Sequence, residues 1–292
     1  MNKKPKCWKK GVRLKNKKME ISNITKKRIT SYLAEGKRFD NRKLLEYRKI
    51  EIESPVSKNA EGSALVRLGK TEVAAGVKLN VSEPYTDSED AGTLVTTVEL
   101  SPLASSRFEM GPPKIEAVEL ARIVDRGIRE SGFIDFKKLC IKPGEKVWTI
   151  FIDIYPINED GNLIDACCIA AAAALQNAVM PKYDEKTGRV EFGEFTAKKL
   201  PLTERMPITL TVHKISKSII LDPCREEEEA QETRVSFAIS PKGKDCMIHS
   251  IQKGKEMALA QPEIFEMIDT AIAQWKKIYP EIAEKIKKAC ER

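Results

Sequence analysis

The alternation of apolar and polar residues predicts β-strands in the first half of this 292-residue chain. Strand-like runs cover residues 47–53, 64–68, 71–79 and 93–100. A longer alternating run covers residues 146–157, and its even-numbered apolar residues share one face: Trp148, Ile150, Ile152 and Ile154. A turn at Asp40-Asn41 requires a residue that tolerates a positive φ, and asparagine does so. The pattern indicates a sheet with one buried face.

Three segments of this half have helical character. Residues 24–35 place apolar side chains at helical spacing, and Gly36 is suited to end the helix. Residues 114–131 follow the turn Gly111-Pro112-Pro113 and stop at Gly132. Residues 163–179 are so rich in small and apolar side chains that this helix must be buried on all sides.

The second half repeats the order of strands followed by a helix. Strands are predicted at 208–214, 218–221, 235–240 and 247–252, and a helix at 263–290 with an interruption near Pro280. Residues 180–199 carry Pro181, a turn at Gly188 and many charges, which favours a boundary there. We therefore expect a basic extension (1–23) and two domains (24–180 and 181–292), which pack as two α+β halves.

The net charge of +8 comes from the N-terminus. Residues 1–18 contain nine lysines and arginines and no acid, which leaves 42 basic and 43 acidic residues in the remainder. Such a segment favours polyanions, because its binding to them releases counterions. The alternative is a solubilising extension with no partner.

The cysteines, histidines and apolar runs exclude several classes of protein. Seven cysteines without a CxxC spacing suit reduced thiols in a cytosolic protein, and two histidines give little support to a zinc site. No apolar run approaches the roughly 20 residues of a membrane helix, and no apolar segment follows the basic N-terminus. We expect a cytoplasmic protein without a metal or a cofactor.

The helix at 114–131 carries the candidate binding residues. Arg122, Arg126 and Arg129 are spaced i, i+4, i+7 and fall within roughly 60° of one another. The opposite side is apolar: Ala117, Leu120, Ile123, Val124, Gly127 and Ile128. Guanidinium groups bind phosphate through two parallel hydrogen bonds, so the three could follow an RNA backbone. The alternative is a solvated face, in which Glu119 pairs with Arg122 and Asp125 with Arg129.

Several segments carry a family resemblance: G-K-R-F-D-N-R, F-E-M-G-P-P, E-L-A-R-I-V-D-R, I-K-P-G-E-K-V-W-T-I and G-N-L-I-D-A-C. Over residues 25–290 the chain resembles the ribonuclease PH family, and within it the non-catalytic core subunit of the archaeal exosome. The resemblance implies a ribonuclease PH-like α+β fold (ribosomal protein S5 domain 2-like). It also implies that the arginine helix faces RNA and phosphate. The implied partners are RNA, cap proteins and a catalytic ribonuclease PH-like subunit, with which three heterodimers form a hexameric ring.

Two elements of the catalytic family members are absent. They bind phosphate beside a Gly-Ser/Thr-Arg element, whereas this chain has Gly161-Asn162-Leu163-Ile164-Asp165, so the arginine is missing and Asp165 adds a negative charge. They also carry an aspartate in the second half, where this chain has Thr233 or Arg234. Glu232 is one position away and could restore a carboxyl group.

The resulting hypothesis is a non-catalytic ring subunit that binds RNA and structures the active site of its partner. The chain then has no catalytic residue, and Arg122, Arg126 and Arg129 contact RNA. The alternatives are an active phosphorolytic 3′–5′ exoribonuclease that uses Glu232, a stand-alone RNA-binding protein, and a subunit of a eukaryotic-type ring. Residues 226–229 are four consecutive acids, which indicate a solvated loop more than a metal site. Asp153 and Asp165 are further carboxylates that the sequence does not bring together.

Overall fold

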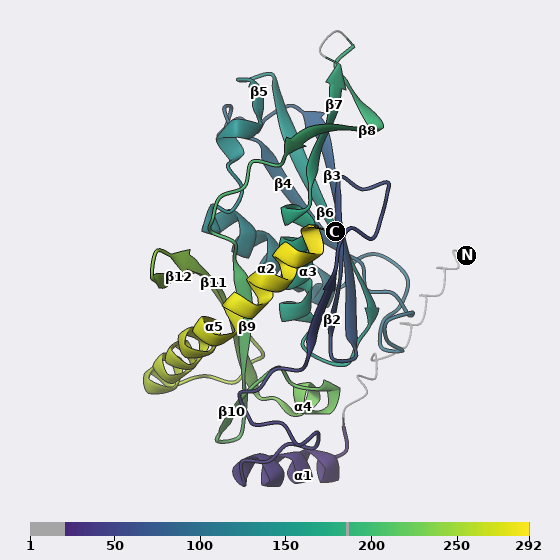
Figure 1. Ribbon diagram of the computed structural model, residues 1–292. Helices are drawn as coiled ribbons and strands as arrows, with labels where there is room; N and C mark the ends of the chain where they lie inside the picture. The colour runs from purple at the N-terminus through teal and green to yellow at the C-terminus, as the bar shows by residue number, and fades with distance from the viewer. Residues whose placement is uncertain (1–20, 185–186, 292) are drawn as a thin grey trace, which may run out of the picture.

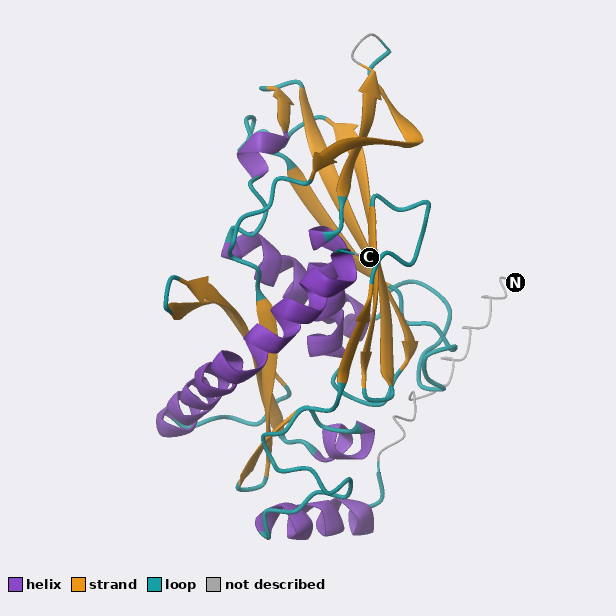
Figure 2. Ribbon diagram, viewed as in Figure 1, coloured by secondary structure: helices purple, strands orange, loops and turns teal. Residues whose placement is uncertain are grey.

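A computed structural model describes residues 21–184 and 187–291 of the chain (Figure 1). The predicted basic extension lies outside the described residues except for 21–23. Figure 2 shows helices and strands mixed through the whole molecule. Within the described ranges, no helix is long and apolar enough to cross a membrane.

The first half is built on a six-stranded sheet. Its path runs β1 (Ile50–Glu53), β2 (Gly62–Leu68), β3 (Thr71–Ser82), β6 (Lys146–Asn158) and β4 (Thr93–Val98), and β5 (Cys140–Lys142), which follows a 3₁₀ turn at Phe136–Leu139, pairs with β6. All pairs are antiparallel except β4 with β6, which is parallel. The predicted apolar face of β6 is confirmed, because Trp148, Ile150, Ile152 and Ile154 are all buried.

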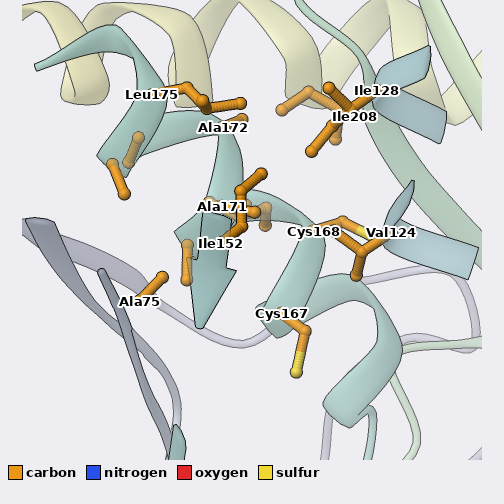
Figure 3. Close-up of a cluster of buried hydrophobic side chains, with 14 of the residues drawn as sticks. Ala75, Val124, Ile128, Ile152, Cys167, Cys168, Ala171, Ala172, Leu175 and Ile208 are labelled. Carbon is orange, nitrogen blue, oxygen red and sulfur yellow. The ribbon is translucent and has the colours of Figure 1, made fainter. Parts of the chain in front are cut away.

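Helices α2 (Ile115–Ser131) and α3 (Leu163–Gln176) pack against this sheet. Every residue from Leu163 to Leu175 is buried, as the composition of the segment predicts. Figure 3 shows side chains of α3, including Cys167, Cys168 and Ala171, among side chains of the sheet, of α2 and of the second half. The small side chains of α3 therefore lie at the centre of the molecule, where the halves meet.

The second half contains a four-stranded antiparallel sheet. Its order is β10 (Ser218–Leu221), β9 (Ile208–Ile215), β11 (Thr233–Lys242) and β12 (Asp245–Gly254). All residues of β9 are buried, because this strand packs against α3 on one side and α5 (Gln261–Cys290) on the other. Leu210, Phe237 and Trp275 belong to the same apolar core as the first sheet. The two α+β halves are therefore packed together, as predicted.

Helix α1 (Asn23–Ala34) lies at one end of the molecule, beside α4 (Arg225–Ala230) (Figure 1). The Ser22 hydroxyl accepts a hydrogen bond from the Thr25 N–H at 3.1 Å and caps the helix. Ile29 and Leu33 form a small second core with residues of β9, β10 and α4. The predicted turn after α1 is confirmed, since Asn41 has a φ of 62°.

Between the two halves, the structure differs from the secondary structure that the sequence predicts. Helix α3 ends at Gln176 and not at residue 179, because β7 (Val179–Asp184) and β8 (Arg189–Lys199) form an antiparallel hairpin. The sequence indicated an irregular boundary loop there, because Pro181 is unusual in a strand. The hairpin accommodates Pro181 by shifts in register on both sides of it. A division at residues 180 and 181 would fall within β7, and it stays a prediction.

Two further expectations were wrong. Helix α5 runs through Pro280 without interruption, because Trp275 before it and Ile282 and Ile286 after it are all buried and hold both parts on one axis. The four acids at 226–229 lie in helix α4 and not in a solvated loop. One of them, Glu227, is buried.

Candidate nucleic-acid interface

Helix α2 has one apolar face and one basic face, as its spacing predicts. Its buried residues are Ala117, Leu120, Ile123, Val124, Gly127, Ile128 and Ser131. Gly127 allows close contact with β11, because a Cβ there would lie 3.2 Å from the Cβ of Ala238. Gly132 has a φ of 65° and ends the helix. Arg122, Arg126 and Arg129 all lie on the exposed side.

The three arginines differ in their partners. Arg129 donates to both carboxylate oxygens of Asp125, at 3.1 and 2.9 Å, and to the carbonyl of Leu94 at 3.0 Å. The hydrogen bonds that Arg129 donates to Asp125 are the main cause that raises the pKa of Arg129 above its usual value. The pairing of Asp125 with Arg129, which the sequence left as an alternative, is therefore present.

Arg122 and Arg126 form no ion pair with any residue in the described ranges. Glu119, the expected partner of Arg122, binds Arg234 of β11 instead at 2.8 Å. Arg126 makes only a long contact of 3.5 Å from its Nη1 to Oε1 of Gln252. These two guanidinium groups are thus available for an anion, whereas that of Arg129 is engaged.

Two grooves run along α2, and Arg122 and Arg126 line both. The first, called here the β4 groove, has a volume of about 620 Å³ and lies between α2 and strands β4 and β6. The second, the β12 groove, has a volume of about 370 Å³ and lies between α2 and strand β12. The grooves meet at the basic face of the helix, so one extended ligand could contact both arginines from either side.

The charges of the two grooves differ. The β4 groove contains three carboxylates, those of Glu99, Asp125 and Asp153. The β12 groove contains Ser250, Ile251 and Gln252, and its one acid, Glu119, is paired with Arg234. Carboxylates repel a polyanion at short range. The β12 groove is therefore the more favourable of the two for a phosphate backbone.

The start of α3 has no open site for a phosphate. Leu163 and Ile164 are buried apolar residues at its first two positions. Asp165 is fully buried and accepts hydrogen bonds from the hydroxyls of Tyr47 (2.6 Å) and Thr211 (2.8 Å). Burial raises the pKa of Asp165 to about 6. This carboxyl group joins the two halves of the fold and does not face an exposed cavity.

The candidate carboxylate positions of the second half are also occupied by structural contacts. Thr233 donates its hydroxyl to the carbonyl of Gly254 at 3.1 Å. Arg234 binds Glu119, and its Nη1 has no hydrogen-bond partner among the described residues. Glu232 accepts the N–H of Ser216 at the turn between β9 and β10, at 3.2 Å. Glu232 lines neither groove, so the structure gives no support to a catalytic role for it.

The other carboxylates do not form a catalytic pair or a metal centre. Asp153 lines the β4 groove and accepts the hydroxyl of Thr97, whereas Asp165 lies in the core. No group of three or more histidine, cysteine, aspartate or glutamate side chains in the described part of the chain is placed to hold a metal ion.

A buried ion network lies beside α4, and the sequence did not predict it. The Nε of Arg38 donates to Glu227 at 3.0 Å, and both side chains are excluded from solvent. Arg42 and Arg48 both bind Asp222, at 2.9 and 2.7 Å. Arg38 and Arg42 lie in the turn after α1 and Arg48 in the segment that leads into β1, but their acidic partners are more than 170 residues away in the sequence. The network fixes the N-terminal segment onto the second half.

Comparison with known proteins agrees with this architecture. A model of the 3′ exoribonuclease family, domain 1, matches residues 46–181, and one of domain 2 matches residues 205–274. The exosome complex component Rrp42 of Methanosarcina acetivorans is 43% identical over 253 residues, which are 86% of this chain and 91% of that protein. Rrp42 of Pyrococcus horikoshii is 43% identical over 274 residues, which are 93% and 98% of the two chains.

Solved structures show the same fold. A chain of the Archaeoglobus fulgidus exosome with RNA bound to the active site has a TM-score of 0.79 and 38% identity, and covers 88% of this chain and 97% of its own. A chain of an archaeal exosome core has a TM-score of 0.75 and 35% identity, and covers 89% and 96%.

The fold is thus that of a ribonuclease PH-like subunit, in which two α+β halves share one core. The chain belongs to the 3′ exoribonuclease family. The predicted fold class and the resemblance to archaeal exosome subunits are confirmed.

Proposed function

We propose that this chain is the non-catalytic subunit of an exosome ring, which binds RNA and structures the active site of a catalytic partner. The observation that carries the proposal is the pair Arg122 and Arg126, exposed beside the β12 groove without a carboxylate partner in the described ranges. The names of the relatives and the RNA in one of the related structures support it.

The lack of catalysis is inferred from what stands at the expected catalytic positions. Phosphorolysis requires a bound inorganic phosphate and a group that can transfer a proton. Leu163 and Ile164 offer no side-chain donor to a phosphate, and neither Thr233 nor Arg234 supplies a carboxyl group. The chain would therefore contribute the position of the RNA, while its partner performs the chemistry.

RNA would lie in the β12 groove. Arg122 and Arg126 would bind successive phosphates, and the Nε2 group of Gln252 could donate to a sugar or phosphate oxygen in place of its long contact of 3.4 Å with the carbonyl of Lys253. Such contacts carry no sequence preference, which suits a general degradation machine. The predicted role of Arg129 remains part of the proposal, although its guanidinium would have to leave Asp125 to reach RNA.

The partner would cover the apolar side chains at the open side of the β12 groove, so that the RNA lies between the two subunits. Ile115, Val118 and Ile251 line this groove and are exposed by 75%, 41% and 51%. Exposed apolar residues grouped in this way mark a protein interface. We propose that the interface belongs to a hexameric ring of three heterodimers in the cytoplasm, with cap proteins that bind RNA.

The test is phosphate-dependent degradation of a 3′-tailed RNA by the purified chain, by a catalytic family member and by their mixture. Release of nucleoside diphosphates by the mixture above that of the catalytic subunit alone, with none from this chain alone, supports the proposal. Turnover by this chain alone would identify it as an enzyme. RNA binding by a monomer that does not associate with the catalytic subunit would favour the stand-alone RNA-binding protein.

A charge-reversal variant of the two arginines distinguishes a role in RNA binding from a role in assembly of the complex. Arg122→Glu with Arg126→Glu should reduce retention of RNA by the complex and leave the size of the complex unchanged. Loss of assembly in this variant would show that both arginines are interface residues, which contradicts their proposed role.

A further inference from the structure

The positive charge of the chain is concentrated far from the two grooves. Residues 1–45 contain 16 of the 51 basic residues and 3 of the 43 acidic residues, a net charge of +13, whereas the rest of the chain has a net charge of −5. Helix α1 is the first described element of this basic region. Its first turn contains no acid, although acids are favoured at that end of a helix.

An exposed cluster of aromatic and cationic side chains extends from α1 to the following turn. The rings of Tyr32 and Phe39 lie 5.0 Å apart, and Phe39 is 40% exposed. The guanidinium carbon of Arg28 lies 5.6 Å from the centre of each ring. Lys27 and Arg28 are exposed and have no ion-pair partner in residues 21–184 and 187–291. We call Lys27, Arg28, Tyr32 and Phe39 the α1 cluster.

We propose that the α1 cluster is a second binding site, which takes single-stranded RNA without sequence preference. A planar guanidinium held against two rings presents a surface on which a base can stack. The unpaired cations would bind the adjacent phosphates and release counterions. The nine basic residues at positions 1–18 would raise the local concentration of RNA by long-range attraction.

This site is separate from the one in the proposed function. Helix α1 packs on β9, β10 and α4 through Ile29 and Leu33, and no residue of α1 lines the β4 groove or the β12 groove. In Figure 1, α1 forms one end of the molecule, and α2 lies nearer its middle. The α1 cluster would therefore hold a part of the RNA away from its 3′ end, and it can exist whether or not the chain is catalytic.

The test measures the affinity of the assembled complex for a labelled single-stranded RNA at several salt concentrations. The first variant carries Lys27→Glu and Arg28→Glu. Its control carries Lys277→Glu and Lys287→Glu, two exposed lysines of α5 without an ion pair among the described residues, so both change the charge equally. Loss of two phosphate contacts should lower the salt slope by about 1.4 and weaken binding about 25-fold at 0.1 M salt.

A second variant isolates stacking. Phe39→Ala removes one exposed ring without a change in charge and should weaken binding about five-fold or more at every salt concentration, with an unchanged slope. Equal losses in the charge variant and in its α5 control would overturn the proposal, and so would full affinity in Phe39→Ala. Loss of binding to phosphatidylserine-containing vesicles with unchanged RNA affinity would assign the cluster to a membrane surface instead.

Phosphorolysis of a short RNA separates this proposal from the proposed function. The α1 variants should leave the rate with an oligonucleotide of about ten nucleotides unchanged. An RNA of that length occupies only the groove and the partner's active site, and does not reach α1. Arg122→Glu with Arg126→Glu should lower the same rate. A reduced rate in the α1 variants, together with the reduced rate of the Arg122→Glu and Arg126→Glu variant, would overturn the second site and leave the groove in place.

Discussion

The buried pair of Arg38 and Glu227 offers the sharpest test of how the N-terminal segment is held. Both side chains are excluded from solvent. Arg38 also donates to the carbonyls of Leu221 at 2.9 Å and Asp222 at 2.8 Å. Arg38→Met keeps much of the volume and removes every donor. The variant therefore leaves a buried carboxylate without its cation and two carbonyls without this partner.

The free energy of unfolding should fall steeply in this variant. Removal of one member of a buried pair costs about 3–5 kcal/mol, and the hydrogen bond lost at the Leu221 carbonyl adds to this, whereas the Asp222 carbonyl still accepts from Arg42 at 3.0 Å. A whole domain is stable by about 5–15 kcal/mol, so Arg38→Met should approach global unfolding. The double variant Arg38→Met with Glu227→Leu should recover about 2 kcal/mol or more, since no charge is then left alone.

Urea unfolding, followed by circular dichroism, measures these differences. Arg67→Met is the matched control, because Arg67 pairs with Glu53 and Glu72 on the partly exposed sheet and should cost less than about 1 kcal/mol. A cost for Arg38→Met no larger than that of the control would refute the reasoning. So would a double variant that is less stable than Arg38→Met.

Three further predictions concern α2, the core carboxyl and the second half. Arg129→Ala should cost about 0.5–1 kcal/mol in thermal unfolding, because its ion pair with Asp125 is partly exposed to solvent. Arg122→Ala should weaken RNA binding and leave stability unchanged, and equal effects in both variants would contradict their different contacts. The pKa of Asp165, raised to about 6, means that its protonation stabilises the fold at low pH and that this contribution is lost as the pH rises through 6. The wild type should therefore gain on the order of 1 kcal/mol over Asp165→Asn between pH 8 and pH 5, and parallel pH profiles would exclude this assignment. Glu232→Gln should leave phosphorolysis by the complex within about two-fold of the wild type, since no proton transfer depends on it; a larger loss would restore it as a catalytic candidate.

Elements with a strong period were predictable from the sequence. The alternation around Ile150 and Ile152 predicts a strand with one face exposed to water. The apolar segment that ends at Leu175 predicts a helix with no exposed face, and both predictions hold in the structure. The basic face of α2 followed from spacing in the same way. Its geometry is confirmed, and its role as an RNA contact stays a prediction.

Features that depend on distant partners were not predictable. The i, i+3 spacing predicted an ion pair between Glu119 and Arg122. In the structure Glu119 instead pairs with Arg234, which lies more than 100 residues away in the sequence. The sequence indicates solvated acids at 226–229, because Arg38, the cation that pairs with the buried Glu227, lies 189 residues earlier. Pro181 suggested a break in the chain, whereas the partner strand β8 tolerates it through a shifted register. Each case required knowledge of which segments lie side by side.

The two thiols in the centre of α3 give the molecule an internal chemical reporter. Cys167 and Cys168 are buried, and burial raises the pKa of Cys168 to about 12, so neither group reacts as a thiolate while the halves stay packed. An alkylating reagent would reach them only when the core opens. The rate of their modification therefore measures, without any added label, how often the two halves of the native chain separate.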